Sequence, residues 1–288
     1  MISSRLCAAA LLVPLVCAGA AAQQTPPGLS ISLSLQSVHP GDVVRVDLGG
    51  ASEADRPAGT VFGKSLAFAF DPAGGVWRAL IGVDLDTKPG TYRLAVTAGG
   101  APRTADVTFR VAPKTFSVRR LKVAAGFVNP PAEALEQIAR DARILTGIFA
   151  AATPTRWTGA FLSPVDGTPT SNFGTRSYFN GVPRSPHAGV DFMSGTGTPI
   201  RGAGHGIVAL AEPLYFTGNT VIVDHGAGLY SLFAHLSAFR VAKGDPVAPD
   251  TIVGLVGATG RVTGPHLHWS VRLNGARVDP LSLVAATQ

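Results

Sequence analysis

The chain has 288 residues, a formal net charge of +6 and only 15% charged residues. This length leaves room for about two domains. A positive charge so small and so dispersed gives no argument for binding nucleic acid. Together with 34 glycines, the low charge favours a β-rich protein with many tight turns.

Residues 1–22 have the pattern of a secretory signal peptide. Arg5 precedes an apolar run from Leu6 to Val16, and small residues follow it. The run is too short to span a membrane, and no second hydrophobic segment follows. We therefore expect export to the periplasm or the extracellular space and no integral membrane segment in the mature chain. A lipid anchor on Cys17 is the alternative, although the bulky Val16 before it fits lipoprotein processing poorly.

Both cysteines of the chain, Cys7 and Cys17, lie inside this segment. We therefore expect a mature chain without disulfides, in which a metal site has to be built from His, Asp and Glu. Removal of Arg5 with the signal lowers the net charge by one. The remaining basicity suits a protein that meets an anionic wall polymer, and it equally suits an ordinary basic secreted protein.

Residues 29–112 predict an antiparallel β-sandwich. Short apolar alternations, such as residues 30–35 and 91–96, are separated by turns such as His39–Asp42. Strands at this spacing with proline and glycine turns are typical of sandwich folds. No polar cluster in this part indicates catalysis, and His39 is interpreted as a solvated loop residue.

Residues 113–160 predict a linker that contains one amphipathic helix. Four apolar residues between positions 131 and 145 share one helical face, and Asn129 before two prolines is a plausible start signal. The predicted face consists of Leu135, Ile138, Ala142 and Leu145. We expect this helix to pack on one or both domains.

Residues 161–286 are again β-rich and contain many glycines. Strand-like runs are separated by turns such as Lys243–Val247, which is typical of compact barrel-like domains. The predicted fold class is therefore all-β with one connecting helix. It comprises an N-terminal β-sandwich and a C-terminal antiparallel β-sheet or barrel-like domain.

His266 and His268 are the most informative residues of this C-terminal part. Residues at i and i+2 point the same way only on a β-strand, where Leu267 between them then points into a core. Two imidazoles on one strand face indicate zinc ligation or general acid–base chemistry.

His187 and Asp191, four residues apart, offer two further ligands. Zinc hydrolases usually keep three protein ligands and leave one position for water, and His187, Asp191 and His268 match that number. Catalysis also needs groups that transfer a proton and hold an oxyanion. His266 and His235 are the candidates for these roles. Taken singly, each motif is also explained by a loop histidine or by a hydrogen-bonded strand histidine.

Four sequence segments together resemble the lysostaphin-like (LytM-type) zinc metallopeptidases. They are Ser171–Arg176 continued by Phe179–Gly181 and Arg184–Asp191, then Gly218–Gly226, Phe233–Ser237, and Gly257–Trp269. The similarity covers roughly residues 161–282, in the right order and with no ligand missing.

The resemblance implies zinc (Zn²⁺) held by His187, Asp191 and His268, with His235 and His266 sharing the acid–base and oxyanion roles in either order. It implies a secreted endopeptidase that hydrolyses peptide bonds of peptidoglycan stems or cross-bridges, with peptidoglycan peptides as partners. The preceding all-β part is similar to the immunoglobulin-like module of exported members of the family.

The resemblance also implies a substrate groove between loops of the C-terminal domain. Two other residues, Asn219 and Arg176, could line this groove and contact substrate, although turn or surface positions explain them as well. His205 and His225 are interpreted as structural. The glycines between positions 257 and 264 lack the GK[ST] of a phosphate loop and are interpreted as turns.

Two alternative functions come from other classes of protein. The first is a non-catalytic binding or activator protein of cell-wall amidases, as in relatives that have lost their ligands, but all five positions are intact here. The second is a phosphocarrier with a histidine phosphate acceptor, which the export signal and the histidine pair disfavour. The bond cut, the oligomeric state, and a blocking role of the sandwich or the linker stay open at this point.

Overall fold

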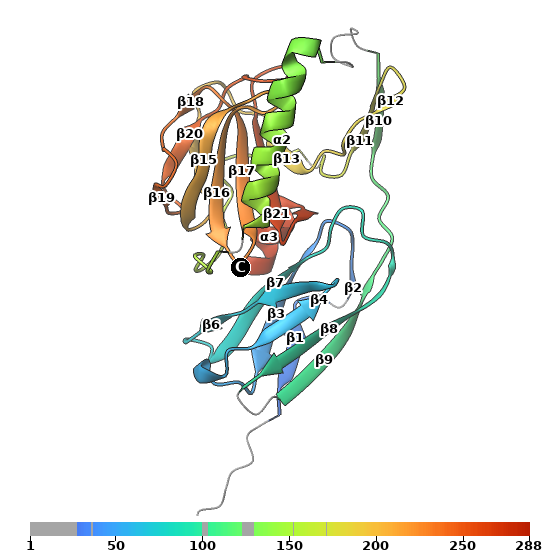
Figure 1. Cartoon of the computed structure of the whole chain (residues 1–288), viewed down its shortest axis with the longest axis vertical. Helices are drawn as coiled ribbons and strands as arrows, with labels where there is room; N and C mark the ends of the chain where they lie inside the picture. The colour runs from blue at the N-terminus through green and yellow to red at the C-terminus, as the bar shows by residue number, and fades with distance from the viewer. Residues whose placement is uncertain (1–27, 36, 100–102, 123–129, 152, 171) are drawn as a thin grey trace, which may run out of the picture.

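The computed structural model describes residues 28–35, 37–99, 103–122, 130–151, 153–170 and 172–288. The predicted signal peptide, with Cys7 and Cys17, lies outside these residues. Figure 1 shows an N-terminal body of strands below and a C-terminal body above it. Among the helices of the described residues, none has the length and apolar character needed to cross a membrane.

The N-terminal body consists of two sheets that enclose one apolar core. The sheets have the strand orders β1-β3-β7-β6 and β2-β9-β8-β4-β5, and only the β2–β9 pair is parallel. The elements are β1 (Ser30–Leu33), β2 (Ser37–Val38), β3 (Val43–Gly49), the 3₁₀ turn η1 (Glu53–Asp55), β4 (Ala58–Val61), β5 (Lys64–Ala67), β6 (Ala69–Asp71), β7 (Val76–Gly82), β8 (Gly90–Ala98) and β9 (Arg103–Val111).

Alternate residues of each long strand fill this core, as the period-2 pattern predicts. Val44, Val46 and Leu48 of β3 are fully buried against the facing sheet. Two sheets over one core are the arrangement that a sandwich requires. The immunoglobulin-like assignment stays a prediction.

The C-terminal body is built on an antiparallel main sheet with the order β13-β21-β17-β16-β15-β19, and β22 pairs with β21. Its strands are β13 (Gly189–Phe192), β15 (Gly206–Leu214), β16 (Gly218–Gly226), β17 (Leu229–Leu236), β19 (Pro246–Val247), β21 (Leu267–Leu273) and β22 (Ala276–Val278). A smaller sheet is formed by β14 (Pro199–Arg201), β20 (Ile252–Leu255) and β18 (Ala238–Phe239). Phe192, Phe233 and Trp269 fill the core on one face of the main sheet. The predicted all-β fold class is confirmed.

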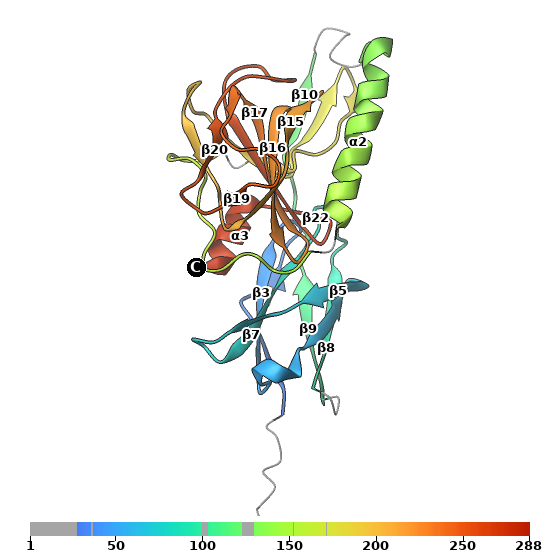
Figure 2. The same ribbon diagram turned by 60° about the vertical axis from the view of Figure 1, so that its left-hand side comes forward.

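The predicted connecting helix is α2 (Leu135–Ala150), preceded by the 3₁₀ turn η2 (Ala132–Ala134). It covers the other face of the main sheet, as Figure 2 shows from the side. Ile144, Leu145, Ile148 and Phe149 pack there on β15, β16 and β17.

The predicted apolar face of this helix is partly wrong. Leu135 is 54% exposed and Ala142 is also exposed, whereas the charged Asp141 is buried. Asp141 accepts a hydrogen bond of 2.8 Å from the backbone N–H of Tyr215. The face of α2 that contacts the sheet therefore includes a buried carboxylate, which satisfies a backbone donor in the turn between β15 and β16.

One helix and one small sheet are not anticipated by the sequence analysis. The helix α3 (Pro280–Thr287) starts at Asp279, whose carboxylate accepts a hydrogen bond of 3.0 Å from the N–H of Leu281. Because nearly all of its residues are apolar, its sequence has no helical periodicity from which the helix could be predicted. In the linker, β10 (Val118–Leu121) pairs in parallel with β11 (Arg176–Phe179), which also pairs with β12 (Val182–Pro183).

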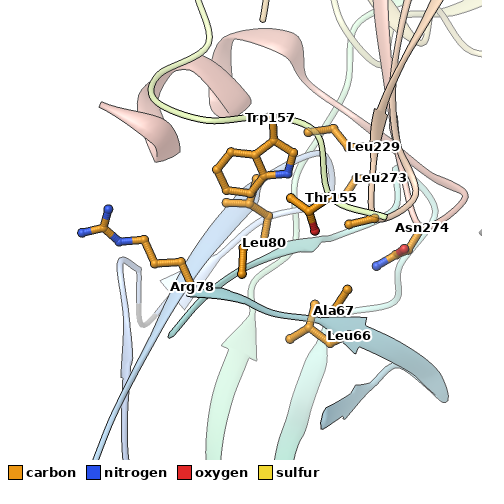
Figure 3. A pocket seen from close by; sticks show the side chains of 11 residues that line it. Leu66, Ala67, Arg78, Leu80, Thr155, Trp157, Leu229, Leu273 and Asn274 are labelled. Carbon is orange, nitrogen blue, oxygen red and sulfur yellow. The ribbon is translucent and has the colours of Figure 1, made fainter. Parts of the chain in front are cut away.

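The two bodies pack directly on each other. Arg277 of β22 donates hydrogen bonds of 2.6 Å to Asp84 and 2.7 Å to Asp86, both in the loop after β7. A Cβ added at Gly82 would lie 3.1 Å from side-chain atoms of Leu273 and Val278, so the backbones approach closely. Figure 3 shows where the bodies meet around Leu80, Trp157 and Leu273, and the gap left there, about 10 Å³, holds at most one water.

We predict that Asp84→Asn destabilises the fold by about 1–2 kcal/mol at pH 7, a value discounted for partial solvent exposure. Burial raises the pKa of Asp84, but the hydrogen bonds with Arg277 outweigh it and lower this pKa to about 2. Because the pKa is lower in the folded state, the contribution is complete above the ordinary value of 3.8 and is lost as the pH falls toward 2. Urea unfolding of both proteins at several pH values measures the difference.

Asp86→Asn is the matched control, because the Asp86 side chain is 50% exposed and should contribute less. Equal stabilities of wild type and Asp84→Asn at pH 7 would contradict the prediction, as would a difference that persists unchanged near pH 2.

Candidate metal centre and catalytic site

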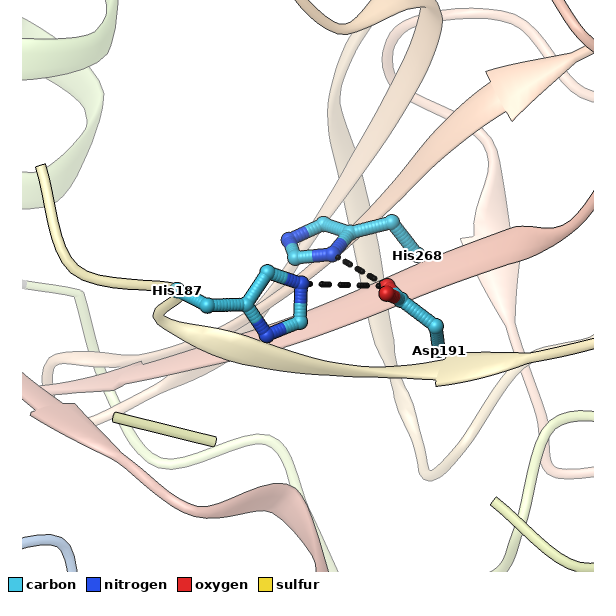
Figure 4. A group of neighbouring side chains, drawn as sticks. All are labelled: His187, Asp191 and His268. Atoms are coloured by element: carbon cyan, nitrogen blue, oxygen red, sulfur yellow. Dashed lines mark hydrogen bonds and ion pairs between the residues drawn. The ribbon is translucent and has the colours of Figure 1, made fainter. Parts of the chain in front are cut away.

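His187, Asp191 and His268 meet where β13 pairs with β21 (Figure 4). Asp191 and His268 are direct partners in this antiparallel register, and His187 lies in the segment just before β13. Nε2 of His187 lies 3.1 Å and Nδ1 of His268 lies 2.9 Å from Oδ1 of Asp191. All three potential ligand atoms lie within 4.8 Å of one another.

This donor set fits zinc. Tetrahedral zinc with bonds of about 2.0–2.1 Å separates its ligand atoms by about 3.3 Å. The distances of 3.1 Å and 2.9 Å from the two histidine nitrogens to Oδ1 of Asp191 are close to this value. Burial opposes ionisation of Asp191, but hydrogen bonds with His187 and His268 outweigh it and hold the pKa of Asp191 well below its ordinary value. Burial also lowers the pKa of His268. An ionised carboxylate and a neutral imidazole are the forms that bind a metal ion.

Gly189 makes room for the His268 ring. A Cβ added at this position would lie 2.8 Å from Cε1 and 2.9 Å from Nε2 of His268, and it would also collide with the carbonyl oxygen of Trp269. The glycine two residues before Asp191 therefore sets how closely β13 approaches the imidazole on the next strand.

We predict that Gly189→Ala weakens zinc binding at least tenfold while the protein remains folded, because the methyl group displaces His268 from Asp191. Zinc affinity by competition with a chromophoric chelator measures the effect, and circular dichroism checks the fold. Gly195→Ala is the control, since nothing lies within 4 Å of a Cβ added there. Zinc affinity unchanged in Gly189→Ala would show that the ring is not constrained by this glycine.

Asn172 orients the carboxylate of Asp191 and was missed by sequence reasoning. Its Nδ2 donates a hydrogen bond of 2.7 Å to Oδ2, the oxygen that faces away from the two histidines. Thr170 donates to the backbone carbonyl of Asp191 from both its N–H (2.8 Å) and its hydroxyl (3.0 Å). The only signal in the sequence was the position of Asn172 inside the first segment that resembles the family. No spacing rule connects Asn172 to Asp191, which lies 19 positions further along the chain.

We predict that Asn172→Ala lowers zinc affinity roughly 10- to 100-fold, the usual effect of removing a group that orients a metal ligand. Chelator competition measures the affinity directly and does not depend on activity. Gln137→Ala, which removes an exposed amide from α2, should leave the affinity unchanged. Equal affinities of Asn172→Ala and wild type would contradict the orienting role.

His235 and His266 lie beside the metal cluster. Their ring centroids are 4.9 Å apart, and Nε2 of His266 lies 3.9 Å from Oδ1 of Asp191. Leu267 is fully buried, so the two histidines of the closing motif face one site, as strand alternation predicts.

Both histidines have a defined tautomer. Nδ1 of His235 lies 2.9 Å from the carbonyl of Thr259, and Nδ1 of His266 lies 2.9 Å from the carbonyl of Gly264. Because a carbonyl only accepts, each Nδ1 carries a proton, and in the neutral form of the ring Nε2 is then the acceptor. Burial lowers the pKa of His235 to about 4, so this imidazole is neutral at pH 7.

His235 reaches the cluster through an irregular backbone. Its φ of 66° lies in the left-handed region, and the register between β16 and β17 shifts between Asn219 and Val221. Such bulges re-aim a side chain near the end of a strand. Simple alternation along β17 could not have predicted this orientation.

The other predicted residues are placed differently. The guanidinium of Arg176 forms an ion pair of 2.7 Å with Asp86 of the N-terminal body, and its contact with substrate stays a prediction. Asn219 donates from Nδ2 to the carbonyl of Leu236, the residue after His235, at 3.0 Å, and its contact with substrate also stays a prediction. His225 is fully buried between the carbonyl of His205 and the hydroxyl of Ser231, as its structural interpretation predicts.

The model of Peptidase family M23 matches residues 185–280, a range that includes all five of these His and Asp positions. A solved structure of a putative peptidase M23 from Pseudomonas aeruginosa is 35% identical, covers 86% of this chain and 95% of its own, and superposes with a TM-score of 0.68. The chain therefore belongs to peptidase family M23, and the resemblance to lysostaphin-like peptidases is confirmed.

Curated relatives match about a third of the chain. The DD-carboxypeptidase/endopeptidase Mpg of Neisseria meningitidis serogroup B is 42% identical over 101 residues, which are 35% of this chain and 23% of the relative. The peptidoglycan DD-endopeptidase ShyA of Vibrio cholerae is 38% identical over 112 residues, or 38% and 26% of the two chains. The chain thus spans about a quarter of the length of these relatives.

Proposed function

We propose that this protein is an exported, zinc-dependent endopeptidase that hydrolyses peptide bonds in peptidoglycan stems or cross-bridges. The observation that carries the proposal is the convergence of His187, Asp191 and His268 with two further histidines at their side. A relative named as a peptidoglycan DD-endopeptidase is 38% identical over 112 residues of the chain, and the family model covers all five His and Asp positions. The predicted signal peptide supports action outside the cytoplasm.

His187, Asp191 and His268 would hold the zinc ion. When bound, zinc supplies polarisation of the scissile carbonyl and activation of a water at neutral pH. Asn172 fixes the carboxylate of Asp191 through its outer oxygen, and Gly189 leaves room for the ring of His268. These contacts keep the donor atoms together before substrate arrives.

His235 and His266 then provide the proton transfer. Each is held by a backbone carbonyl at Nδ1 and presents Nε2 as a base. An imidazole that has taken a proton at Nε2 can donate it to the leaving amine or to a developing oxyanion. His235 and His266 would therefore act as a pair, one as the base and the other as the hydrogen-bond donor.

His187→Ala and His268→Ala should each lose zinc and hydrolysis together, because each removes a ligand. His266→Ala should retain zinc while hydrolysis falls roughly 10²- to 10⁴-fold, the usual contribution of a general acid or base. Zinc is measured by elemental analysis of the purified protein. Hydrolysis is measured by mass spectrometry of fragments released from sacculi of defined cross-link types.

His39→Ala, in the N-terminal body and 44% exposed, is the control and should change neither readout. Wild-type protein that contains stoichiometric zinc but releases no fragment from any cross-link type would refute the proposed function. The non-catalytic activator alternative would then be favoured, although the intact ligand set argues against it.

A further inference from the structure

The strand β17 contains one extra residue in its pairing with β16. In this register Asn219 lies opposite Leu236 and Val221 lies opposite Phe233, so three steps along β17 match two steps along β16. The bulge includes His235, whose φ of 66° lies in the left-handed region. A bulge re-aims a side chain and interrupts the hydrogen bonds of the ladder. Other groups must therefore hold the backbone around His235 if its ring is to stay in the proposed active site.

The side-chain hydroxyl of Thr259 joins the two strands at this bulge. It accepts a hydrogen bond of 2.9 Å from the backbone N–H of Asn219 and donates one of 2.8 Å to the backbone carbonyl of Leu236. Asn219 and Leu236 are opposite each other in the register, so the hydroxyl lies between a donor and an acceptor of neighbouring strands. The amide of Asn219 donates a further hydrogen bond of 3.0 Å to the same carbonyl. One hydroxyl from a distant loop thus links the start of β16 to the residue that follows His235.

The backbone of Thr259 also contacts the ring of His235. Its carbonyl oxygen lies 2.9 Å from Nδ1 of that ring. The backbone N–H of His235 donates a hydrogen bond of 2.8 Å to the carbonyl of Thr217, in the turn before β16. A Cβ added at Gly218 in this turn would collide with the carbonyl group and the hydroxyl of Thr259. The turn and the loop are therefore in direct contact, and the position of Thr259 determines the position of its carbonyl against the ring.

We propose that Thr259 is a positioning residue for His235, because its hydroxyl holds in place the carbonyl that sets the tautomer and direction of the imidazole. This inference rests on the proposed function of the same site. Threonine suits the role because a hydroxyl is both donor and acceptor and a β-branched side chain has few rotamers. If the hydroxyl only fastened the loop, its loss would lower the stability of the protein and leave His235 unchanged.

The first measurement follows the His235 ring by NMR of the zinc-loaded protein with isotopically labelled histidine. In the wild type we expect an observable Nδ1 proton on His235, protected from exchange by its hydrogen bond to the Thr259 carbonyl. Thr259→Val should lose this signal or shift it toward the other tautomer. Thr259→Ser keeps the hydroxyl and should restore it. The signal is assigned by its absence in His235→Ala.

The second measurement is the hydrolysis of a cross-linked peptide that the wild type cleaves. We expect Thr259→Val to lower kcat roughly 10- to 100-fold with little change in KM, because the imidazole is present but misplaced. Zinc content should stay stoichiometric, since no metal ligand is changed. Thr259→Ser should recover most of kcat. Equal losses of kcat in the valine and serine variants would overturn the proposal, and so would a wild-type kcat in Thr259→Val.

Thr251→Val is the matched control. Thr251 precedes β20 in the same body, and its hydroxyl also accepts a backbone hydrogen bond of 2.9 Å, from the N–H of Ala248. Its loss should lower the melting temperature about as much as the loss of the Thr259 hydroxyl, while the His235 signal and kcat stay unchanged. An equal change of the His235 signal in Thr251→Val and Thr259→Val would show a general loss of stability and would overturn the proposal.

The His235 signal separates this inference from the proposed function. A protected Nδ1 proton that is lost in Thr259→Val and restored in Thr259→Ser supports the positioning role even if no peptide is hydrolysed, which would refute only the proposed function. Hydrolysis together with an identical signal in Thr259→Val would overturn only the positioning role. Thr259→Ala is measured in parallel, because it removes the hydroxyl without placing a methyl group against the carbonyl of Leu236, and it decides the question if the valine variant does not fold.

Discussion

The pairing of β13 with β21 is the constraint on which the site depends. Its antiparallel register places Asp191 opposite His268, and a shift of one residue would send both side chains to the opposite face. The alternate residues Val190, Phe192, Leu267 and Trp269 are fully buried in the core. Burial of these four side chains therefore fixes the register, and the register brings the metal ligands together. The chemistry of the site is in this sense a consequence of core packing.

The two faces of the main sheet are covered by different parts of the structure. One face packs against the large core, whereas the other carries Asp191 and His268 at one end and the helix α2 elsewhere. Arg272, four residues after His268 and hence on the same face, lies 5.6 Å from the Phe149 ring of α2. The helix thus covers the apolar part of this face and shields it from solvent. A sheet covered on both sides explains why β17 is buried along its whole length.

Much of the site was predictable because its chemistry follows local rules. The i, i+2 spacing of His266 and His268 implied a common direction, and the four-residue spacing of His187 and Asp191 supplied the remaining ligands. The residues that were missed depend on contacts distant in sequence. Asn172 is recognised only when its amide is seen against Asp191. His235 enters the site through a positive φ that no alternation rule describes.

In the fold, too, the features that follow local sequence patterns were predicted and those that depend on distant contacts were missed. Strands were anticipated where apolar residues alternate, and α2 where they recur with helical spacing. The buried face of α2 was predicted wrongly because it includes Asp141, whose carboxylate accepts a hydrogen bond from the backbone N–H of Tyr215 in the turn between β15 and β16. The helix α3 was missed because it is apolar on most sides, so no period distinguishes it. In both cases tertiary contacts overrode the local pattern.

The strand β21 connects the metal site to the contact between the two bodies. It carries His268 near its start, and its last residue, Leu273, packs against Gly82 of the N-terminal body, next to the Arg277 ion pairs of β22. Because β21 lies in a close-packed interior, a displacement of Leu273 strains the neighbouring residues of the same strand toward His268. The contact between the two bodies therefore supports the position of the metal ligands. The N-terminal body is in this respect part of the scaffold that keeps His268 in place, so a protein cut between the two bodies would be a less rigid metal-binding module.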